Sequence, residues 1–320
     1  MRALLVVNTF ATQTSIELSE LIAAALQSRV DLTVVNTEAP GDATTVAKEF
    51  TDARSGNSNH SDNEVIIALG GDGTSNEIAN GILSAPMDST QNTLPILAAL
   101  PGGNANVYSR NLGFHRDAIK ATAQLLRAID SMNVRTMDVG LVSTPTHDRY
   151  FLFNAGYGLD AAVVARMQEY RASRNRVSDA RYLATALQVL ANGRERTHPH
   201  IQINEYEQRV HFAIVTNMSP WTYLGKRAID PAPRSTGSDG LSVIASTSMS
   251  IKNVARLSRE FIRSADVANN PDAITLSHQN EVRCQSDRPE WLQIDGEALE
   301  QVTSVQIRQS KAALRVLTCV

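Results

Sequence analysis

Residues 64–83 constrain the fold of this chain more than any other stretch of it. They begin with Val65 to Leu69, an uninterrupted apolar run rich in β-branched residues, which is typical of a strand buried on both faces. A glycine-rich turn, Gly70 to Gly73, follows, and beyond it apolar residues recur at helical spacing. The stretch therefore predicts a strand, a tight turn and a helix capped by Thr74 or Ser75.

This arrangement is suited to an anion, because the free amides and the positive dipole end of the helix point at the turn. A tight strand–helix turn with no ligand is the alternative. The acid inside the turn, Asp72, and the polar Asn76 and Glu77 in the first helical turn favour a nucleotide site. The sequence fits neither the P-loop pattern nor Gly-x-Gly-x-x-Gly, so those two kinds of site are excluded.

The first 138 residues alternate expected strands with expected helices, which predicts a largely parallel sheet with helices on both faces. Ligands bind beyond the carboxyl ends of such strands, where the segments Asn8 to Thr12, Thr37 and Gly70 to Asn76 should converge. A second glycine turn, Pro101 to Gly103, follows the next apolar run and should lie at the same edge. Two such turns on neighbouring strands strengthen the nucleotide interpretation.

The length of 320 residues suggests two domains. Short alternating runs dominate after Asp138, which predicts an antiparallel β-sandwich at 139–307, with 308–320 returning to the first domain. The net charge of −3 and an aromatic content of 5% argue against nucleic-acid binding. Two unpatterned cysteines favour a reducing cytoplasm, and no apolar run is long enough to span a membrane, so any membrane contact is expected to be peripheral.

The full set of motifs resembles the diacylglycerol kinase catalytic-domain family, which includes bacterial lipid kinases and sphingosine kinases. The resemblance spans nearly the whole chain and is carried, in family order, by Gly70 to Glu77 with Asn80-Gly81, Pro101 to Gly103 with Asn106, Arg110 to Gly113, Asp138 to Gly140, Asn154 to Ala161, Asp239 to Leu241, and Asp295 to Glu297. Gly-Gly-Asp-Gly-Thr alone is also similar to NAD kinases and phosphofructokinases, which lack the segment that begins at Asn154.

The resemblance implies an N-terminal three-layer α/β domain, a C-terminal β-sandwich, and a nucleotide cleft between them. It implies ATP-dependent phosphorylation of a lipid hydroxyl with Mg²⁺, in which Asp72 holds the metal and Asp138 joins through water. The residues expected to contact the nucleotide are Asn8, Thr9, Thr12, Thr37, Gly70, Gly71, Asp72, Gly73, Thr74, Ser75, Asn76, Glu77, Gly102, Gly103, Asn104 and Asn106.

Asp295 and Glu297 are the candidates for the general base, because an alcohol needs a carboxylate within hydrogen-bond reach to accept its proton. The resemblance does not decide between the two. The alternative is an exposed hairpin, since Asp-Gly is a common type I′ turn. The resemblance also implies a structural Mg²⁺ loop, with the carboxylate of Asp239 and the backbone carbonyls of Thr236 and Leu241 as ligands; a plain turn is the alternative.

The chain departs from the family at two of these places. The first nucleotide loop, Asn8 to Thr12, lacks the usual Pro and Gly. The second glycine turn is one residue longer than usual, and Val107 replaces an acid, so Asn104 and Asn106 are the remaining neutral oxygen ligands there. The expected partners are a nucleotide and a lipid substrate at the membrane surface, and a homodimer stays open. A kinase of a soluble acceptor such as NAD and a catalytically weak nucleotide-binding regulator are the alternatives.

Overall fold

The computed structural model describes residues 1–55, 63–84, 94–172, 198–225, 227–230 and 239–319. The chain divides into two compact units. Unit 1 comprises Met1–Val139 with Lys311–Val320, and unit 2 comprises Gly140–Ser310. Two strands contribute residues to both units, β5 (Val134–Ser143) and β15 (Glu297–Leu317). No helix within the described part of the chain combines the length and apolar character that crossing a bilayer requires.

Unit 1 is built on a parallel sheet with the strand order β15-β4-β3-β1-β2. The strands that complete it are β1 (Arg2–Asn8), β2 (Asp31–Thr37), β3 (Val65–Gly70) and β4 (Ile96–Pro101). All residues of β3 and β4 are buried, which agrees with their uninterrupted apolar sequences. The buried strand predicted at Val65 to Leu69 is therefore confirmed.

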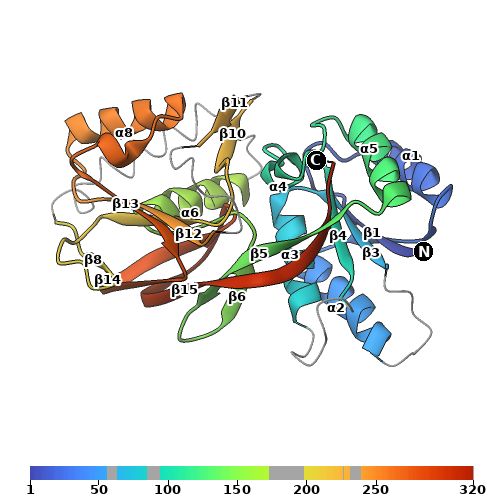
Figure 1. Cartoon of the computed structure of the whole chain (residues 1–320), viewed down its shortest axis with the longest axis horizontal. Helices are drawn as coiled ribbons and strands as arrows, with labels where there is room; N and C mark the ends of the chain where they lie inside the picture. The colour runs from blue at the N-terminus through green and yellow to red at the C-terminus, as the bar shows by residue number, and fades with distance from the viewer. Residues whose placement is uncertain (56–62, 85–93, 173–197, 226, 231–238, 320) are drawn as a thin grey trace. The chain divides into compact units, whose positions relative to one another are not determined.

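Helices cover both faces of this sheet (Figure 1). Helix α1 packs on α5, and α2 packs on α3. The bounds are α1 (Ile16–Gln27), α2 (Asp42–Ser55), α3 (Asp72–Leu83), α4 (Val107–Asn111) and α5 (Ala118–Ser131). Gly81 permits the close approach of α2 and α3, because a Cβ there would lie 2.5 Å from the carbonyl oxygen of Thr44.

Unit 2 is built mainly from antiparallel strands, in the order β13-β12-β9-β7-β14-β15 with β8 paired to β14 and β6 to β5. The bounds of its remaining strands are β6 (Asp148–Phe151), β7 (Asn154–Gly158), β8 (Ile201–Ile203), β9 (Phe212–Thr216), β10 (Thr222–Leu224), β11 (Arg227–Ile229), β12 (Leu241–Ser246), β13 (Ala273–Gln279) and β14 (Glu281–Ile294). The prediction of an α/β domain followed by antiparallel strands is confirmed.

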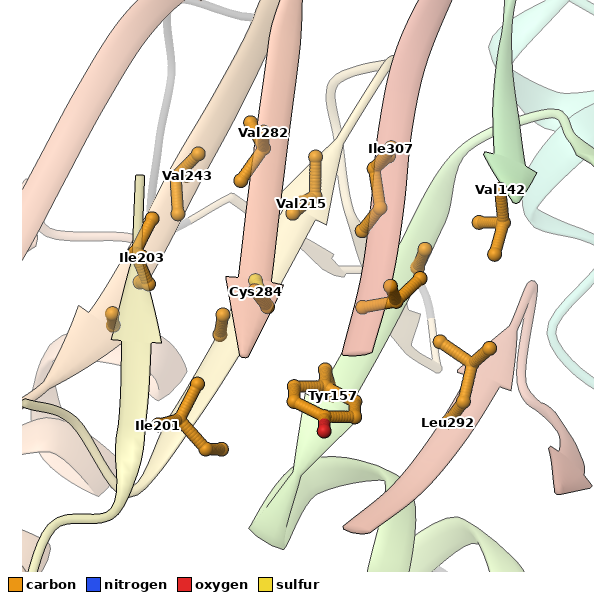
Figure 2. Packing of buried hydrophobic residues seen from close by; sticks show 14 of the residues in the cluster. Val142, Tyr157, Ile201, Ile203, Val215, Val243, Val282, Cys284, Leu292 and Ile307 are labelled. Carbon is orange, nitrogen blue, oxygen red and sulfur yellow. The ribbon is translucent and has the colours of Figure 1, made fainter. Parts of the chain in front are cut away.

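The antiparallel strands enclose an apolar core. Figure 2 shows side chains from several strands meeting in it, among them Val215 of β9, Val243 of β12, Val282 of β14 and Ile307 of β15. Tyr157 is fully buried there, and its hydroxyl donates to the carbonyl oxygen of Val302 at 2.7 Å. The polar end of this ring is therefore satisfied inside the core, as burial requires.

A second apolar cluster lies under the helices of unit 2, which are α6 (Leu159–Ala172), α8 (Ile251–Arg263) and the 3₁₀ turn η2 (Val267–Asn269). It joins Leu257 of α8 to Leu159, Phe212 of β9 and Ile244 of β12. Trp221 and Phe261 pack against this cluster, and their two rings meet edge to face with the centroids 5.5 Å apart. This packing fixes α8 on the faces of β9 and β12.

Two local predictions are wrong. Helix α3 begins at Asp72 after an extended Gly71, and neither Thr74 nor Ser75 caps it, because both are buried inside the helix. The alternating sequence also predicts two separate strands, Val302 to Ile307 and Ala313 to Leu317. These residues instead belong to the single strand β15, in which Ala312 adopts a left-handed conformation with φ of 49°. The sequence further predicts a helix over residues 179–190, which lie outside the described residues.

Candidate functional site

Two glycine turns pack backbone against backbone at the carboxyl edge of the unit 1 sheet. Strands β3 and β4 run in register from Val65 opposite Ile96 to Gly70 opposite Pro101. The amide of Gly102 then donates to the carbonyl oxygen of Gly70 at 2.7 Å. A Cβ on Gly103 would lie 2.6 Å from the Cα of Gly71. Position 103 therefore needs glycine for the fold itself.

Gly71 is different, since the fold leaves room for a side chain there. Its backbone is extended, with φ of −89°, and a Cβ would meet only the Cα of Gly103 at 3.6 Å, an ordinary contact. Gly71 is also the N-cap of helix α3, and as a glycine it has no side chain that could cap the amides of that helix end. A bare turn before uncapped amides is the geometry that receives a phosphate group.

Asp72 connects the two turns. Its Oδ1 accepts the amide of Tyr108 at 2.9 Å, so this carboxylate caps the short helix α4. Burial raises the pKa of Asp72, and this effect is opposed by hydrogen bonds from the amides of Tyr108 and Val107 and by the charge of Arg110. A partly buried carboxylate at the mouth of an anion-binding turn is a suitable ligand for a hard cation such as Mg²⁺.

The longer second turn is locked by Asn106. This residue is buried, has φ of 49°, and uses both ends of its side-chain amide on Gly103: Oδ1 accepts the amide at 2.8 Å, and Nδ2 donates to the carbonyl at 2.7 Å. Val107 is buried behind it, whereas Asn104 is exposed. Asn106 thus has a structural role that accounts for its position without a metal.

The first loop reaches both glycine turns. Nδ2 of Asn8 donates to Oγ1 of Thr74 at 3.0 Å, and the amide of Gln13 donates to the carbonyl oxygen of Gly102 at 2.9 Å. Thr37 lies opposite Asn8 in the sheet and is buried, with its hydroxyl 3.5 Å from the carbonyl oxygen of Val7. The structure therefore brings together Asn8, the turn after β3 and the turn after β4.

The other residues expected to contact the nucleotide are paired elsewhere, buried, or exposed to solvent. Glu77 caps helix α2, because its carboxylate accepts the amides of Gly41 at 3.0 Å and Ala43 at 3.2 Å. Asn76 is buried and accepts from the side chain of Asn80. Ser75 is buried in α3, while Thr9 and Thr12 are exposed in the first loop.

Asp138 lies at the end of unit 1, where its Oδ1 accepts the amide of Ala312 at 2.6 Å. The described residues contain no group of three or more His, Cys, Asp or Glu side chains arranged to hold a metal. Of the residues expected in a structural Mg²⁺ loop, Thr236 lies outside the described residues, Asp239 is exposed, and Leu241 is buried in β12 opposite Gln279. The carbonyl oxygen of Asp239 lies 2.9 Å from Nδ1 of His278.

In unit 2, Asp295 and Gly296 form a tight hairpin turn between β14 and β15. Both have positive φ, 49° and 83°, and Ile294 pairs with Glu297 across the turn, as a type I′ turn requires. The hairpin alternative is therefore correct as a description of the backbone. Asp295 itself is buried rather than exposed.

The two acids of this turn have different surroundings. The carboxylate of Asp295 accepts three backbone amides, from Leu152 at 2.7 Å to one oxygen and from Phe153 and Asn154, both at 3.0 Å, to the other. The side chain of Glu297 is 40% exposed, and Arg149 lies beside it at 3.2 Å. Asp295 is thus engaged in holding the segment before β7, whereas Glu297 can reach solvent or a substrate.

A buried polar network supports the turn. Gln293 donates to Oδ1 of Asn154 at 2.9 Å and to Oδ2 of Asp160 at 3.1 Å, and its Oε1 accepts the amide of Gly296 at 2.9 Å. Burial raises the pKa of Asp160 from 3.8 to about 6, against the effect of the hydrogen bond from Gln293. Sequence analysis places Asn154 and Asp160 in a motif without assigning them roles, and no sequence pattern points to Gln293 or Arg149.

This chain is similar to proteins that are named as kinases. Residues 2–142 match the family described as the diacylglycerol kinase catalytic domain. A protein of Staphylococcus carnosus with the provisional name lipid kinase is 27% identical over 90% of this chain and 86% of its own length. A diacylglycerol kinase of Bacillus subtilis is 36% identical over 123 residues, which is 38% of this chain and 33% of that protein.

Solved structures show the same fold. A crystal structure of a diacylglycerol kinase from Bacillus anthracis superposes with a TM-score of 0.69 at 22% identity, over 99% of this chain and 96% of that one. An NAD kinase from Archaeoglobus fulgidus in complex with ATP superposes with a TM-score of 0.52 at 13% identity, over 99% and 94% of the two chains. The family match and the curated relatives confirm the resemblance to the diacylglycerol kinase catalytic-domain family, and the solved structures confirm the fold.

Proposed function

We propose that this protein is an ATP-dependent kinase that transfers the γ-phosphate to a hydroxyl of diacylglycerol or a related lipid. The observation that carries the proposal is Gly71, a glycine that the fold leaves room to replace, at the uncapped start of α3. No neighbouring residue requires glycine at position 71, so a ligand that approaches the backbone there would explain it. The amides at the start of the helix favour an anionic ligand. The triphosphate of ATP is that ligand in this proposal.

Mg²⁺ would be held by the carboxylate of Asp72, with Asp138 joining through water, and it would neutralise charge on the transferred phosphoryl group. The donor set fits such an ion, because Asp72 is a carboxylate beside the proposed phosphate site and Mg²⁺ usually keeps several waters. Val107, which stands where the family usually has an acid, is buried. Asp72 is therefore the carboxylate that the two glycine turns offer to the metal.

Glu297 is the proposed general base. A base must have a lone pair free to accept the proton of the acceptor hydroxyl. Glu297 is partly exposed with one ion pair, whereas the oxygens of Asp295 accept three amides. In this proposal Asp295 is a positioning residue, which ties the turn to the segment before β7, and Glu297 abstracts the proton.

The nucleotide part of the proposal is tested with Gly71→Ala. The variant should fold like the wild type, because the added Cβ makes an ordinary contact at 3.6 Å. Its affinity for ATP, measured by isothermal titration calorimetry, should fall at least about tenfold, since a methyl group would stand where a phosphate oxygen approaches the amides. Unchanged ATP affinity in a folded Gly71→Ala protein would contradict the proposed phosphate site.

The acceptor is tested by γ-phosphate transfer from labelled ATP to diacylglycerol, sphingoid bases, glycolipids and NAD. We expect transfer to a lipid and none to NAD. Transfer to NAD alone would favour a soluble acceptor, in line with the fold similarity to an NAD kinase. ATP binding without transfer to any acceptor would favour a nucleotide-binding regulator, consistent with valine at position 107.

A further inference from the structure

Helix α8 of unit 2 has an inner face with complete packing and hydrogen bonding. Leu257 and Phe261 pack into the second apolar cluster (Figure 1 shows α8 with its strands). The buried Glu260 accepts from Arg256 at 3.1 Å and from Asn270 at 3.1 Å, and Asn253 donates to the carbonyl oxygen of Ser248 at 2.7 Å. The contacts that hold α8 to the other described residues of unit 2 therefore come from its inner face.

An uncharged row with isoleucine at both ends runs along the outer face of α8. Ile251, Ala255, Ser258 and Ile262 are spaced by four, three and four residues, which places them on one line of an α-helix. Ile251 is 73% exposed and Ile262 is 47% exposed. Two large aliphatic side chains are thus held at opposite ends of one helix face, about 16 Å apart at the rise of an α-helix.

A cationic row lies next to the uncharged row. Lys252, Arg256, Arg259 and Arg263 repeat the same spacing one residue later, so they form the adjacent line on the helix. Glu260 is the one acid in α8, and it is buried on the inner face. Within the described part of the chain, Arg256 pairs with Glu260, whereas Lys252, Arg259 and Arg263 form no ion pair. The exposed side of α8 is therefore cationic along its length.

We propose that this outer face of α8 binds the surface of an anionic lipid bilayer. Aliphatic side chains in a line enter the boundary between headgroups and acyl chains, while a neighbouring line of Lys and Arg stays at the level of the phosphates. The protein as a whole carries a net charge of −3, so the cationic row is a local feature that matches an anionic surface. The proposal rests on the proposed function, since it would bring the enzyme to a lipid substrate.

A second copy of the chain is a poorer partner for the same face. In a symmetric dimer through α8, the row of Lys252, Arg259 and Arg263 would have to face its own copy or be left at the rim. The face carries no acids to pair with those cations. An anionic bilayer supplies the opposite charge at every position of the row, and it also takes up the isoleucines.

The test is co-sedimentation of the full chain with vesicles of phosphatidylcholine mixed with phosphatidylglycerol, and with vesicles of phosphatidylcholine alone. The wild type should bind the anionic vesicles and be released by salt. Each cation near the surface contributes about fivefold to partitioning, so Lys252→Gln/Arg259→Gln/Arg263→Gln should bind on the order of 100-fold more weakly. Ile251→Ser/Ile262→Ser should weaken binding to anionic vesicles as well.

Matched controls remove the same groups from exposed positions of unit 1. The triple variant Arg116→Gln/Lys120→Gln/Arg127→Gln makes the same change in charge at or near α5. The double variant Leu21→Ser/Ile119→Ser removes two aliphatic side chains that are each 56% exposed. Both control proteins should bind anionic vesicles like the wild type. Equal losses in control and α8 variants, or no loss in the α8 variants, would overturn the assignment of the surface.

The oligomeric state and the activity separate this proposal from its alternatives. A change of dimerisation in the α8 variants, measured by analytical ultracentrifugation, would make the face an interface between copies and overturn the proposal. Phosphorylation of a short-chain diacylglycerol dissolved in water should be the same in α8 variants and wild type, because no bilayer is involved. Vesicle binding that depends on α8, without phosphorylation of any lipid by the wild type, would support the surface and refute the proposed function.

Discussion

Replacement of the two acids of the β14–β15 turn should have opposite consequences. In Asp295→Asn, one side-chain oxygen can still accept the amides of Phe153 and Asn154, but the new NH₂ group then faces the amide of Leu152. One charge-assisted hydrogen bond is lost, worth about 1.5–3 kcal/mol, and a buried amide loses its acceptor at about 1–3 kcal/mol. Asparagine tolerates the positive φ of this position, so backbone strain adds little.

The expected loss is therefore about 3 kcal/mol or more, which corresponds to a fall in melting temperature of roughly 6–12 °C for a unit of this size. Thermal unfolding followed by circular dichroism measures this fall in melting temperature.

In Glu297→Gln, the partly exposed side chain loses one ion pair to Arg149, which should change the stability by less than about 1 kcal/mol. The same variant should lose at least about 100-fold in the rate of phosphoryl transfer, as expected for a removed base.

The comparison of the two variants tests the reasoning directly. Asp295→Asn should be the less stable protein and Glu297→Gln the less active one, when rates are measured at a temperature where both are folded. Wild-type melting of Asp295→Asn would show that its three amide contacts do not stabilise the fold as argued. A larger loss of rate in Asp295→Asn than in Glu297→Gln would move the base to Asp295.

Two further predictions concern buried positions. The pKa of Asp160 is raised from 3.8 to about 6 in the folded protein. Its ionisation therefore lowers the free energy of unfolding as the pH rises from 3.8 to about 6. Asp160→Asn should match the wild type near pH 4 and exceed its stability above pH 6 by up to about 3 kcal/mol, and a difference independent of pH in urea unfolding would contradict this. Gly103→Ala should destabilise unit 1 by about 1–3 kcal/mol, because its Cβ would lie 2.6 Å from backbone, whereas Gly71→Ala should melt like the wild type.

The sequence predicted best where local patterns decide the structure. Val65 to Leu69 is apolar without interruption and forms a fully buried strand. The sequence predicts a helix at about Ile251 to Arg263, and α8 has those bounds. Its N-cap is Ser250, whose hydroxyl oxygen accepts a hydrogen bond from the amide of Asn253 at 3.3 Å. In both cases the information lies in residues that are adjacent or one helical turn apart.

The sequence predicted poorly where a side chain serves a distant backbone. Thr74 and Ser75 have the chemistry of helix caps, but α3 starts earlier because Gly71 is extended and Asp72 is already helical. The carboxylate of Asp72 instead accepts a hydrogen bond from the amide of Tyr108, which is 36 residues away. Glu77 likewise accepts one from the amide of Gly41, also 36 residues away. No spacing rule connects such pairs, so their partners become visible only in three dimensions.

The Asp-Gly-Glu turn shows why a structural and a catalytic interpretation of one motif need not compete. The sequence offered an ordinary hairpin or a general base as alternatives, and the backbone is a hairpin. Two sets of hydrogen bonds hold that hairpin in place. The carboxylate of Asp295 accepts hydrogen bonds from backbone amides, and the amide of Gly296 donates to Oε1 of Gln293. A base acts only when it is held in position, so the clamped turn is what a catalytic Glu297 would require.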